Sequence, residues 1–335
     1  MTKTFEIYKN IENKTVRFKN RFGIEIAGDL YLPEDYANKK NPGIVVSGPF
    51  GAVKEQSSGL YAQEFAKYGF VAIAFDPSFT GESGGEVRNV AEPAIFAEDF
   101  SAAVDFLGTL PYIDRERIGA QAICGLSGMA LTAAGADTRI KAVATASMYD
   151  MSNSMYLGYK NSYSVEQRAK LRDYVSKKRW DDVDNGNVDS SNYEKGWHEL
   201  GFDDEGNVIS GTTLFPKELP TDADPVTTAF YNYYRTPRGY HERSINSTTA
   251  WTATTPMSFY EFDLYKNIKD ISPRPVMFIA GENAQSLYHS EEAYALANEP
   301  KQLVVVPNAD HVDLYDKKDK IPFDKLVNFF EGNLK

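Results

Sequence analysis

The sequence is poor in the residues on which several classes of protein depend. It has one cysteine, Cys124, so a disulfide within the chain is impossible. Its 36 lysines and arginines are outnumbered by 47 aspartates and glutamates and form no basic stripe, which makes nucleic acid an unexpected partner. No apolar run approaches the ~20 residues of a membrane-spanning helix, and the first residues lack the apolar centre of a signal peptide. We therefore expect a soluble cytoplasmic protein with no membrane partner.

Short apolar runs alternate along the chain with patterns typical of amphipathic helices. Residues 43–47, 70–75 and 118–123 suit buried parallel strands, and residues 94–110 repeat apolar side chains at helical spacing. This alternation predicts an α/β fold, with a mostly parallel central sheet and helices on both faces. Further strands are expected over residues 14–19, 24–32, 141–147, 274–280 and 302–306, and further helices over residues 60–68, 129–134, 165–178, 290–298 and 323–330.

The alternation stops at about residue 151 and resumes at about residue 256. The stretch between them is rich in tyrosine, asparagine, aspartate, serine and lysine, and prolines such as Pro225 punctuate its second half. Only a helix over residues 165–178 and a small hairpin around Gly206 are expected there. We interpret residues 1–150 and 256–335 as the core and residues 151–255 as an inserted cap, because so long a loop without structure would be unusual.

Residues 118–134 have the outline of a nucleophile elbow, in which a strand ends at a reactive side chain and a tight turn leads into a helix. The apolar run ends at Cys124, and small residues follow it. The alternative register, Gly125-Leu126-Ser127-Gly128-Met129, makes Ser127 the nucleophile. A third interpretation makes Cys124 a small buried core residue. We favour Cys124 as the nucleophile, because the strand then has its normal length.

A second match to the G-x-S-x-G elbow pattern occurs at residues 81–85, with Ser83 at its centre. It follows residues 70–75 through a polar loop, and residues 86–92 after it have no helical periodicity. We therefore expect Ser83 to lie on a flexible loop and not on an elbow.

His311 has the position of a general base in the order of elements that α/β hydrolases share. It follows the last expected strand, residues 302–306, so it lies at the same carboxyl edge of the sheet as Cys124. The other three histidines, His198, His241 and His289, have no such position. We predict that His311 accepts the proton of the Cys124 thiol.

The oxyanion that forms on attack requires backbone N–H donors. We expect one from Gly125, directly after the nucleophile. The other should come from the turn after residues 43–47, where Pro49 has no N–H, so that Phe50 or Gly51 donates.

The acid that would orient the histidine has no obvious candidate. Its usual place, after the next-to-last strand, has Ala284 where a carboxylate is expected. Asp150, after residues 141–147, and Glu282 are the substitutes, of which we favour Asp150; an interpretation in which Asp150 only anchors the start of the cap stays open. A thiol loses its proton more easily than a hydroxyl does, so a Cys–His pair depends less on an acid.

Five segments together resemble bacterial α/β hydrolases. They are VVSGPFGAVKEQ at residues 45–56, residues 61–85, ICGLSGMA at residues 123–130, RPVMFIAG at residues 274–281 and PNADHVDLYD at residues 307–316. The similarity is to the dienelactone-hydrolase-like and acetyl-xylan-esterase-like group, which is related to X-Pro dipeptidyl-peptidase catalytic domains, and it covers about residues 14–150 and 256–333. Dienelactone hydrolases have a cysteine in G-x-C-x-G, which Cys124 resembles, although Ala122 and Leu126 replace the glycines.

The resemblance and these residues predict an α/β hydrolase that cleaves esters, thioesters or lactones. No metal-ligand cluster or phosphate-cradling glycine loop is present in the sequence, so we expect no metal and no cofactor. A small ester or acyl compound is the expected partner, and a homo-oligomer is possible. Two alternatives stay open: an acyltransferase that uses the same site, and a hydrolase-fold binding protein with a degraded triad, which Ala284 favours.

Overall fold

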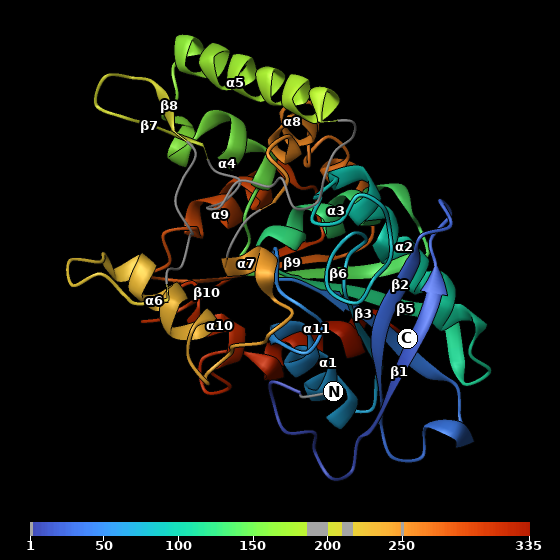
Figure 1. Cartoon of the computed structure of the whole chain (residues 1–335). Coiled ribbons are helices and arrows are strands. Elements are labelled where there is room, and N and C mark those ends of the chain that lie inside the picture. Colours follow the sequence, from blue (N-terminus) through green and yellow to red (C-terminus); the bar gives the residue numbers. More distant parts are fainter. Residues whose placement is uncertain (1–2, 186–199, 210–216, 249–250) are drawn as a thin grey trace.

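An eight-stranded sheet crosses the centre of the computed structural model, which describes residues 3–185, 200–209, 217–248 and 251–335 (Figure 1). The strands lie in the order β1-β2-β4-β3-β5-β6-β9-β10. β2 is antiparallel to both of its neighbours, and all other neighbouring pairs are parallel. The strands are β1 (Glu12–Lys19), β2 (Glu25–Leu32), β3 (Asn41–Ser47), β4 (Val71–Phe75), β5 (Ile113–Ile123), β6 (Ile140–Ala146), β9 (Val276–Gly281) and β10 (Lys301–Val306). The predicted mostly parallel α/β fold is confirmed.

Helices cover both faces of this sheet. The inner strands require this, because they carry apolar side chains on both faces. In β3, Val45 faces a core under α2 (Pro93–Thr109), α3 (Ser127–Ala136) and α9 (Leu287–Leu296). Its neighbours Ile44 and Val46 face a second core under α1 (Ser57–Lys67) and α11 (Phe323–Asn333).

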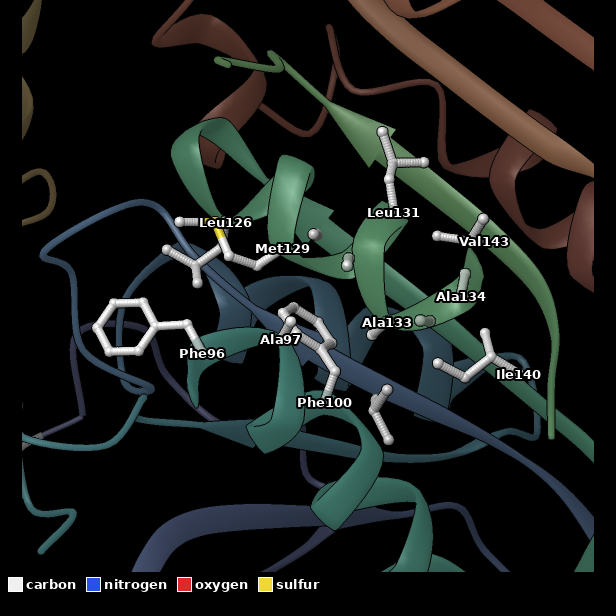
Figure 2. Packing of buried hydrophobic residues seen from close by; sticks show 14 of the residues in the cluster. Phe96, Ala97, Phe100, Leu126, Met129, Leu131, Ala133, Ala134, Ile140 and Val143 are labelled. Carbon is white, nitrogen blue, oxygen red and sulfur yellow. The ribbon is translucent and has the colours of Figure 1, made fainter. Parts of the chain in front are cut away.

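The packing between α2 and α3 supports the turn that follows β5. Figure 2 shows Ala97 and Phe100 of α2 beside Met129 and Ala133 of α3. Phe100 and Met129 are fully buried, and each such side chain contributes ~1.5–3 kcal/mol to the free energy of unfolding. The start of α3 is therefore held rigidly against the sheet.

Between β6 and β9 the described chain forms helices and a small separate hairpin. α5 lies along one end of the molecule, and α6 lies beside α10 next to the sheet (Figure 1). The helices here are α4 (Met151–Leu157), α5 (Val165–Asp184), α6 (Pro225–Tyr234), α7 (Ile245–Thr248) and α8 (Thr255–Tyr260), and the hairpin pairs β7 (Gly201–Phe202) with β8 (Val208–Ile209). The predicted hairpin around Gly206 is confirmed, whereas the division into core and cap stays a prediction. The remaining short elements are η1 (Tyr36–Asn38), η2 (Cys124–Leu126), η3 (Tyr159–Asn161), η4 (Ile268–Ile271) and α10 (Asp313–Asp316).

α6 is a helix that the sequence analysis did not predict. It begins at Pro225, one of the prolines that punctuate the second half of the stretch interpreted as a cap. Proline suits the first position of a helix, because its missing N–H would have no partner there. The Asp224 carboxylate caps the same end by accepting hydrogen bonds from the N–H groups of Val226 at 2.8 Å and Thr227 at 3.1 Å.

Candidate active site

Cys124 lies at a sharp turn between β5 and α3, at the carboxyl edge of the sheet. Its φ is 56°, in the left-handed region that residues other than glycine rarely adopt, and β5 ends at the residue before it. The single turn η2 then leads directly into α3. Strand, strained residue and helix form the geometry of a nucleophile elbow.

Two glycines let the turn after β3 pack directly on this elbow. A Cβ atom on Gly125 would lie 2.6 Å from Sδ of Met151 and 2.7 Å from Cβ of Phe50. Gly48 has a φ of +105°, and a Cβ there would lie 2.2 Å from the carbonyl oxygen of Ile123. Only hydrogen fits at either position, so the backbones of the two turns approach each other closely.

The Cys124 sulfur is buried but faces polar groups. Burial raises the pKa of the thiol, while the Tyr315 hydroxyl and the backbone N–H groups of Gly125 and Phe50 act in the opposite direction by hydrogen bonding. The thiol is therefore neutral at rest. Two N–H groups from separate segments that converge on one reactive side chain are the arrangement of an oxyanion hole.

His311 lies in the loop after β10, and hydroxyl groups face both of its ring nitrogens. The Ser286 Oγ lies 2.5 Å from Nδ1, and the Tyr315 hydroxyl lies 3.0 Å from Nε2. Burial and, to a smaller extent, the neighbouring His289 lower the pKa of His311 to about 3. The imidazole is therefore neutral near neutral pH.

The Tyr315 hydroxyl connects Cys124 with His311. It interacts with the sulfur and with Nε2, and in the described part of the chain no hydrogen bond joins these two atoms directly. Neighbouring segments fix the backbone of this tyrosine, because the Ser57 hydroxyl donates to its carbonyl oxygen at 2.9 Å and the Tyr61 hydroxyl donates to that of Leu314 at 2.7 Å. The predicted pair of Cys124 and His311 is thus brought together through a third side chain.

The aromatic ring of Phe230 on α6 covers the imidazole. The two rings stack with centroids 5.2 Å apart and an interplanar angle of 28°. On another side the ring of Tyr149 meets that of His311 edge-on at 5.2 Å. Residues from the stretch between β6 and β9 therefore help to exclude water from the base.

The structure does not bring the predicted acid, Asp150, to His311. The Asp150 carboxylate instead caps α4, where it accepts a hydrogen bond from the N–H of Asn153 at 3.0 Å. Burial raises its pKa to about 7. The position at Nδ1 belongs to Ser286, so the interpretation that Asp150 anchors the start of the next segment describes its place better.

Glu282, the other candidate acid, supports the loop that carries His311 without reaching the ring. Its carboxylate accepts a hydrogen bond from the N–H of Asn308 at 2.9 Å. Ala284 is buried, and no acidic side chain takes its place among the described hydrogen-bond partners of the imidazole.

The two serines weighed against Cys124 lie in different surroundings. Ser127 has ordinary helical backbone angles at the start of α3, with φ of −60° and ψ of −43°, and its buried Oγ has no hydrogen-bond partner in the described structure. Ser83 lies on a loop, as expected, but the loop is fixed and not flexible: its hydroxyl donates to the Asp76 carbonyl at 2.6 Å and accepts from the Ala27 N–H at 2.8 Å. The elbow geometry belongs to Cys124.

Two residues of this site, Ser286 and Tyr315, were missed in the sequence analysis. Tyr315 follows His311 by four residues, a spacing that places two side chains on one side of a helical turn. Ser286 lies within the loop after β9, where the sequence analysis considered only carboxylates. Tyr315 could have been found from its spacing to His311, whereas Ser286, a single serine in a loop, has no comparable pattern.

The described residues contain neither a metal-binding cluster nor a membrane-spanning helix. No group of three or more histidine, cysteine, aspartate or glutamate side chains is arranged to hold a metal ion there. None of the described helices has the length and apolar character needed to cross a membrane.

The sheet order, the elbow and a histidine after the last strand define an α/β hydrolase. The sequence model of the X-Pro dipeptidyl-peptidase (S15) family matches residues 23–313, so the chain belongs to this family. The resemblance inferred from the sequence is confirmed at this level.

Comparison with individual proteins agrees with this family. The chain is 49% identical over 332 residues to the protein PA2218 of Pseudomonas aeruginosa, covering 99% of this chain and 84% of that one. The crystal structure of PA2218 superposes with a TM-score of 0.90 over 99% of this chain and 96% of that chain. The α/β hydrolase GrgF from a Penicillium species shares the fold, with a TM-score of 0.74 at 18% identity over 96% of this chain and 99% of that one. Thiohydrolase aneE of Aspergillus aculeatus is 37% identical over 138 residues, which are 40% of this chain and 42% of that protein.

Proposed function

We propose that the protein hydrolyses thioesters and activated carboxylic esters through a covalent acyl-enzyme on Cys124. The observation that supports it best is the strained backbone of Cys124, whose sulfur faces two backbone N–H groups and a hydroxyl hydrogen-bonded to a neutral imidazole. A neutral histidine can accept a proton without first losing one.

In the proposed reaction the thiol loses its proton toward His311, and the sulfur attacks the carbonyl carbon of the substrate. The N–H groups of Phe50 and Gly125 hold the negative charge that develops on the carbonyl oxygen. The leaving thiolate or alkoxide departs with the proton from His311. Water, deprotonated by the same imidazole, then attacks the acyl group and releases the free thiol.

Thioesters and activated esters suit this site better than amides do. A sulfur nucleophile exchanges readily with a thiolate or an activated alkoxide, whereas an amine is a poor leaving group by comparison. The partial similarity to a protein named a thiohydrolase supports the same substrate class. Peptide cleavage, which the family name suggests, is therefore our second choice.

Transfer of the acyl group to an alcohol or amine is a further candidate, favoured by one observation. Cys124 is 7% exposed and His311 1% exposed, so water has little access to the proposed acyl-enzyme in this structure. Adding small alcohols and amines to a hydrolysis assay and measuring the ester and amide products would separate transfer from hydrolysis.

Turnover of p-nitrophenyl acetate and of acetyl and butyryl thioesters tests the proposal. We expect wild type and Ser127→Ala to turn over at least one of them, and Cys124→Ala and His311→Ala to lose ~10²-fold or more. An X-Pro p-nitroanilide, measured in parallel, tests peptidase activity. Loss of activity in Ser127→Ala but not in Cys124→Ala, or turnover of the anilide alone, would contradict the proposal.

A further inference from the structure

The contacts around His311 form a row of four polar groups. Their order is the Cys124 sulfur, the Tyr315 hydroxyl, the imidazole of His311 and the Ser286 hydroxyl. The Tyr315 oxygen lies 3.0 Å from Nε2, and the Ser286 oxygen lies 2.5 Å from Nδ1. The Tyr315 hydroxyl also lies close enough to the sulfur to act on the pKa of the Cys124 thiol by hydrogen bonding. All four side chains are buried.

From this row we infer that Tyr315 is a catalytic residue that relays the proton between the Cys124 thiol and His311. The inference rests on the proposed role of Cys124 as the nucleophile. It assigns the transfer to a hydroxyl that touches the reacting sulfur.

The direction of the hydrogen bonds supports such a relay. In the tautomer of His311 that carries its proton on Nδ1, the N–H donates to Ser286 and Nε2 accepts from the Tyr315 hydroxyl. The Tyr315 oxygen still has two lone pairs, with which it can accept from the thiol and from the Tyr234 hydroxyl, its other hydrogen-bond partner. A single chain of donors and acceptors then leads from sulfur to nitrogen.

The step balances without any further reactant. The S–H bond of Cys124 breaks as a new O–H bond forms on Tyr315, and the original O–H bond of Tyr315 breaks as an N–H bond forms on His311. The products are a thiolate, an intact tyrosine hydroxyl and an imidazolium. The same two transfers run in reverse at the end of the cycle, when water has released the acyl group and the sulfur takes a proton back from the imidazolium.

A purely structural role does not account for the place of this hydroxyl. Tyr315 already packs against Phe230, Tyr233 and Tyr234 through its ring, with centroids 6.3, 5.1 and 6.3 Å away. A phenylalanine would keep these contacts. What tyrosine adds is an oxygen between the sulfur and Nε2.

Alkylation of the single thiol by iodoacetamide, followed by intact mass, tests the relay without any substrate. We compare wild type, Tyr315→Phe and His311→Ala with Tyr163→Phe, a control that loses a hydroxyl bonded to the Leu200 carbonyl at 3.0 Å in a separate apolar cluster. Near neutral pH we expect Tyr315→Phe and His311→Ala to be alkylated at least ~10-fold more slowly than wild type, and Tyr163→Phe at the wild-type rate. The difference should narrow as pH rises, because hydroxide then removes the proton without the relay.

The double variant Tyr315→Phe/His311→Ala should be no slower than either single variant, since both act on one chain of bonds. If Tyr315→Phe does not fold, site-specific replacement of Tyr315 by 3-fluorotyrosine keeps the ring and its hydroxyl but makes the phenol more acidic. We then expect the pH profile of alkylation to shift.

Wild-type alkylation rates in Tyr315→Phe, or a slowing that stays constant at every pH, would overturn the relay. An unshifted profile in the fluorotyrosine variant would do the same. Since alkylation needs no ester, a pH-dependent slowing in a protein that turns over no ester or thioester would support the relay while contradicting the proposed function.

Discussion

At the scale of single residues, the site differs from an acid-supported triad in the group that faces Nδ1 of His311. That group is the neutral hydroxyl of Ser286. The pKa of the imidazole is about 3, lowered by burial and by His289. The base is thus free of a proton over a wide pH range, but no carboxylate at Nδ1 stabilises the imidazolium that forms during the reaction.

Replacing Ser286 tests this assignment. A carboxylate in Ser286→Asp would stabilise the imidazolium and raise the pKa of His311, so the base becomes protonated at a higher pH. We expect the acidic limb of the kcat/KM profile to move toward neutral pH in Ser286→Asp. The uncharged Ser286→Ala should lower kcat/KM by ~10-fold without such a move. An acidic limb that stays in place in Ser286→Asp would show that residue 286 does not act on His311.

Replacing Asp150 tests whether this carboxylate is the acid of the site or only a cap of α4. Because its folded pKa is about 7, the folded state holds a proton that the unfolded state releases above ~4, and stability falls as pH rises between these values. Asp150→Asn keeps a good cap for α4 and removes this loss. We expect the free energy of unfolding of Asp150→Asn relative to wild type to grow from about pH 4 to about pH 7 and stay level above, with kcat/KM within ~3-fold of wild type. A loss of ~10²-fold or more in kcat/KM would restore Asp150 as the acid.

Some residues of this site can be predicted from the sequence and others cannot. Cys124 and His311 each follow a recognisable strand, so the order of elements places them at one edge of the sheet. Phe50 and Gly125 follow from the same logic. Ser286 depends on how the loop after β9 folds back, which no local pattern encodes.

At the scale of elements, the elbow depends on close packing between two turns. A Cβ on Gly125 would collide with Met151 and Phe50, whereas one on Gly332 in α11 would meet nothing within 4 Å. Gly125→Ala therefore displaces the Phe50 turn and its N–H group, while Gly332→Ala only improves helix propensity.

We expect Gly125→Ala to lower the free energy of unfolding by ~1–3 kcal/mol and to lower kcat/KM by ~10²-fold. Gly332→Ala, the matched control, should gain ~0.5–1 kcal/mol with unchanged kcat/KM. Urea denaturation and steady-state kinetics give both quantities. Wild-type kcat/KM in Gly125→Ala would show that the position of the Phe50 turn does not matter for catalysis.

Strongly patterned elements are the ones that the sequence predicts. β4 is a continuous apolar run, β3 contains the apolar residues 44–46, and α2 has a clear helical period, so their places follow from the residues alone. The sequence does not predict α6, because its proline resembles a loop residue. It does not predict α10, because four residues are too few to show a helical period. Ring contacts of Phe230 and Tyr233 on α6 with Tyr315 on α10 hold these two helices together.

At the scale of the whole molecule, a buried network of charges ties separate segments together. The Lys54 ammonium is fully buried and contacts Glu55 beside it and Glu82, 2.6 Å away in the loop after β4. Arg243, from the stretch between β6 and β9, pairs with the same two carboxylates. The network therefore joins that stretch to two turns of the sheet.

Removing the central cation should leave the buried Glu55 carboxylate and the partly buried Glu82 carboxylate with one partner fewer. We expect Lys54→Met to lower the free energy of unfolding by ~3 kcal/mol, measured by urea denaturation. Lys177, whose side chain is 73% exposed and pairs with Asp173, provides the control. Lys177→Met should change stability by less than ~0.5 kcal/mol. If the two substitutions changed the free energy of unfolding equally, the network would not be what holds these segments together.

The most direct test of the central claim is to trap the acyl group and find the atom that carries it. Wild type and Cys124→Ala are mixed with an acetyl thioester, quenched in acid and digested with trypsin, which gives one peptide, residues 118–139, that contains both Cys124 and Ser127. We predict an acetyl group on Cys124, located by fragmentation and released by neutral hydroxylamine as a thioester is. An acetyl group on Ser127, or its persistence in Cys124→Ala, would contradict the account.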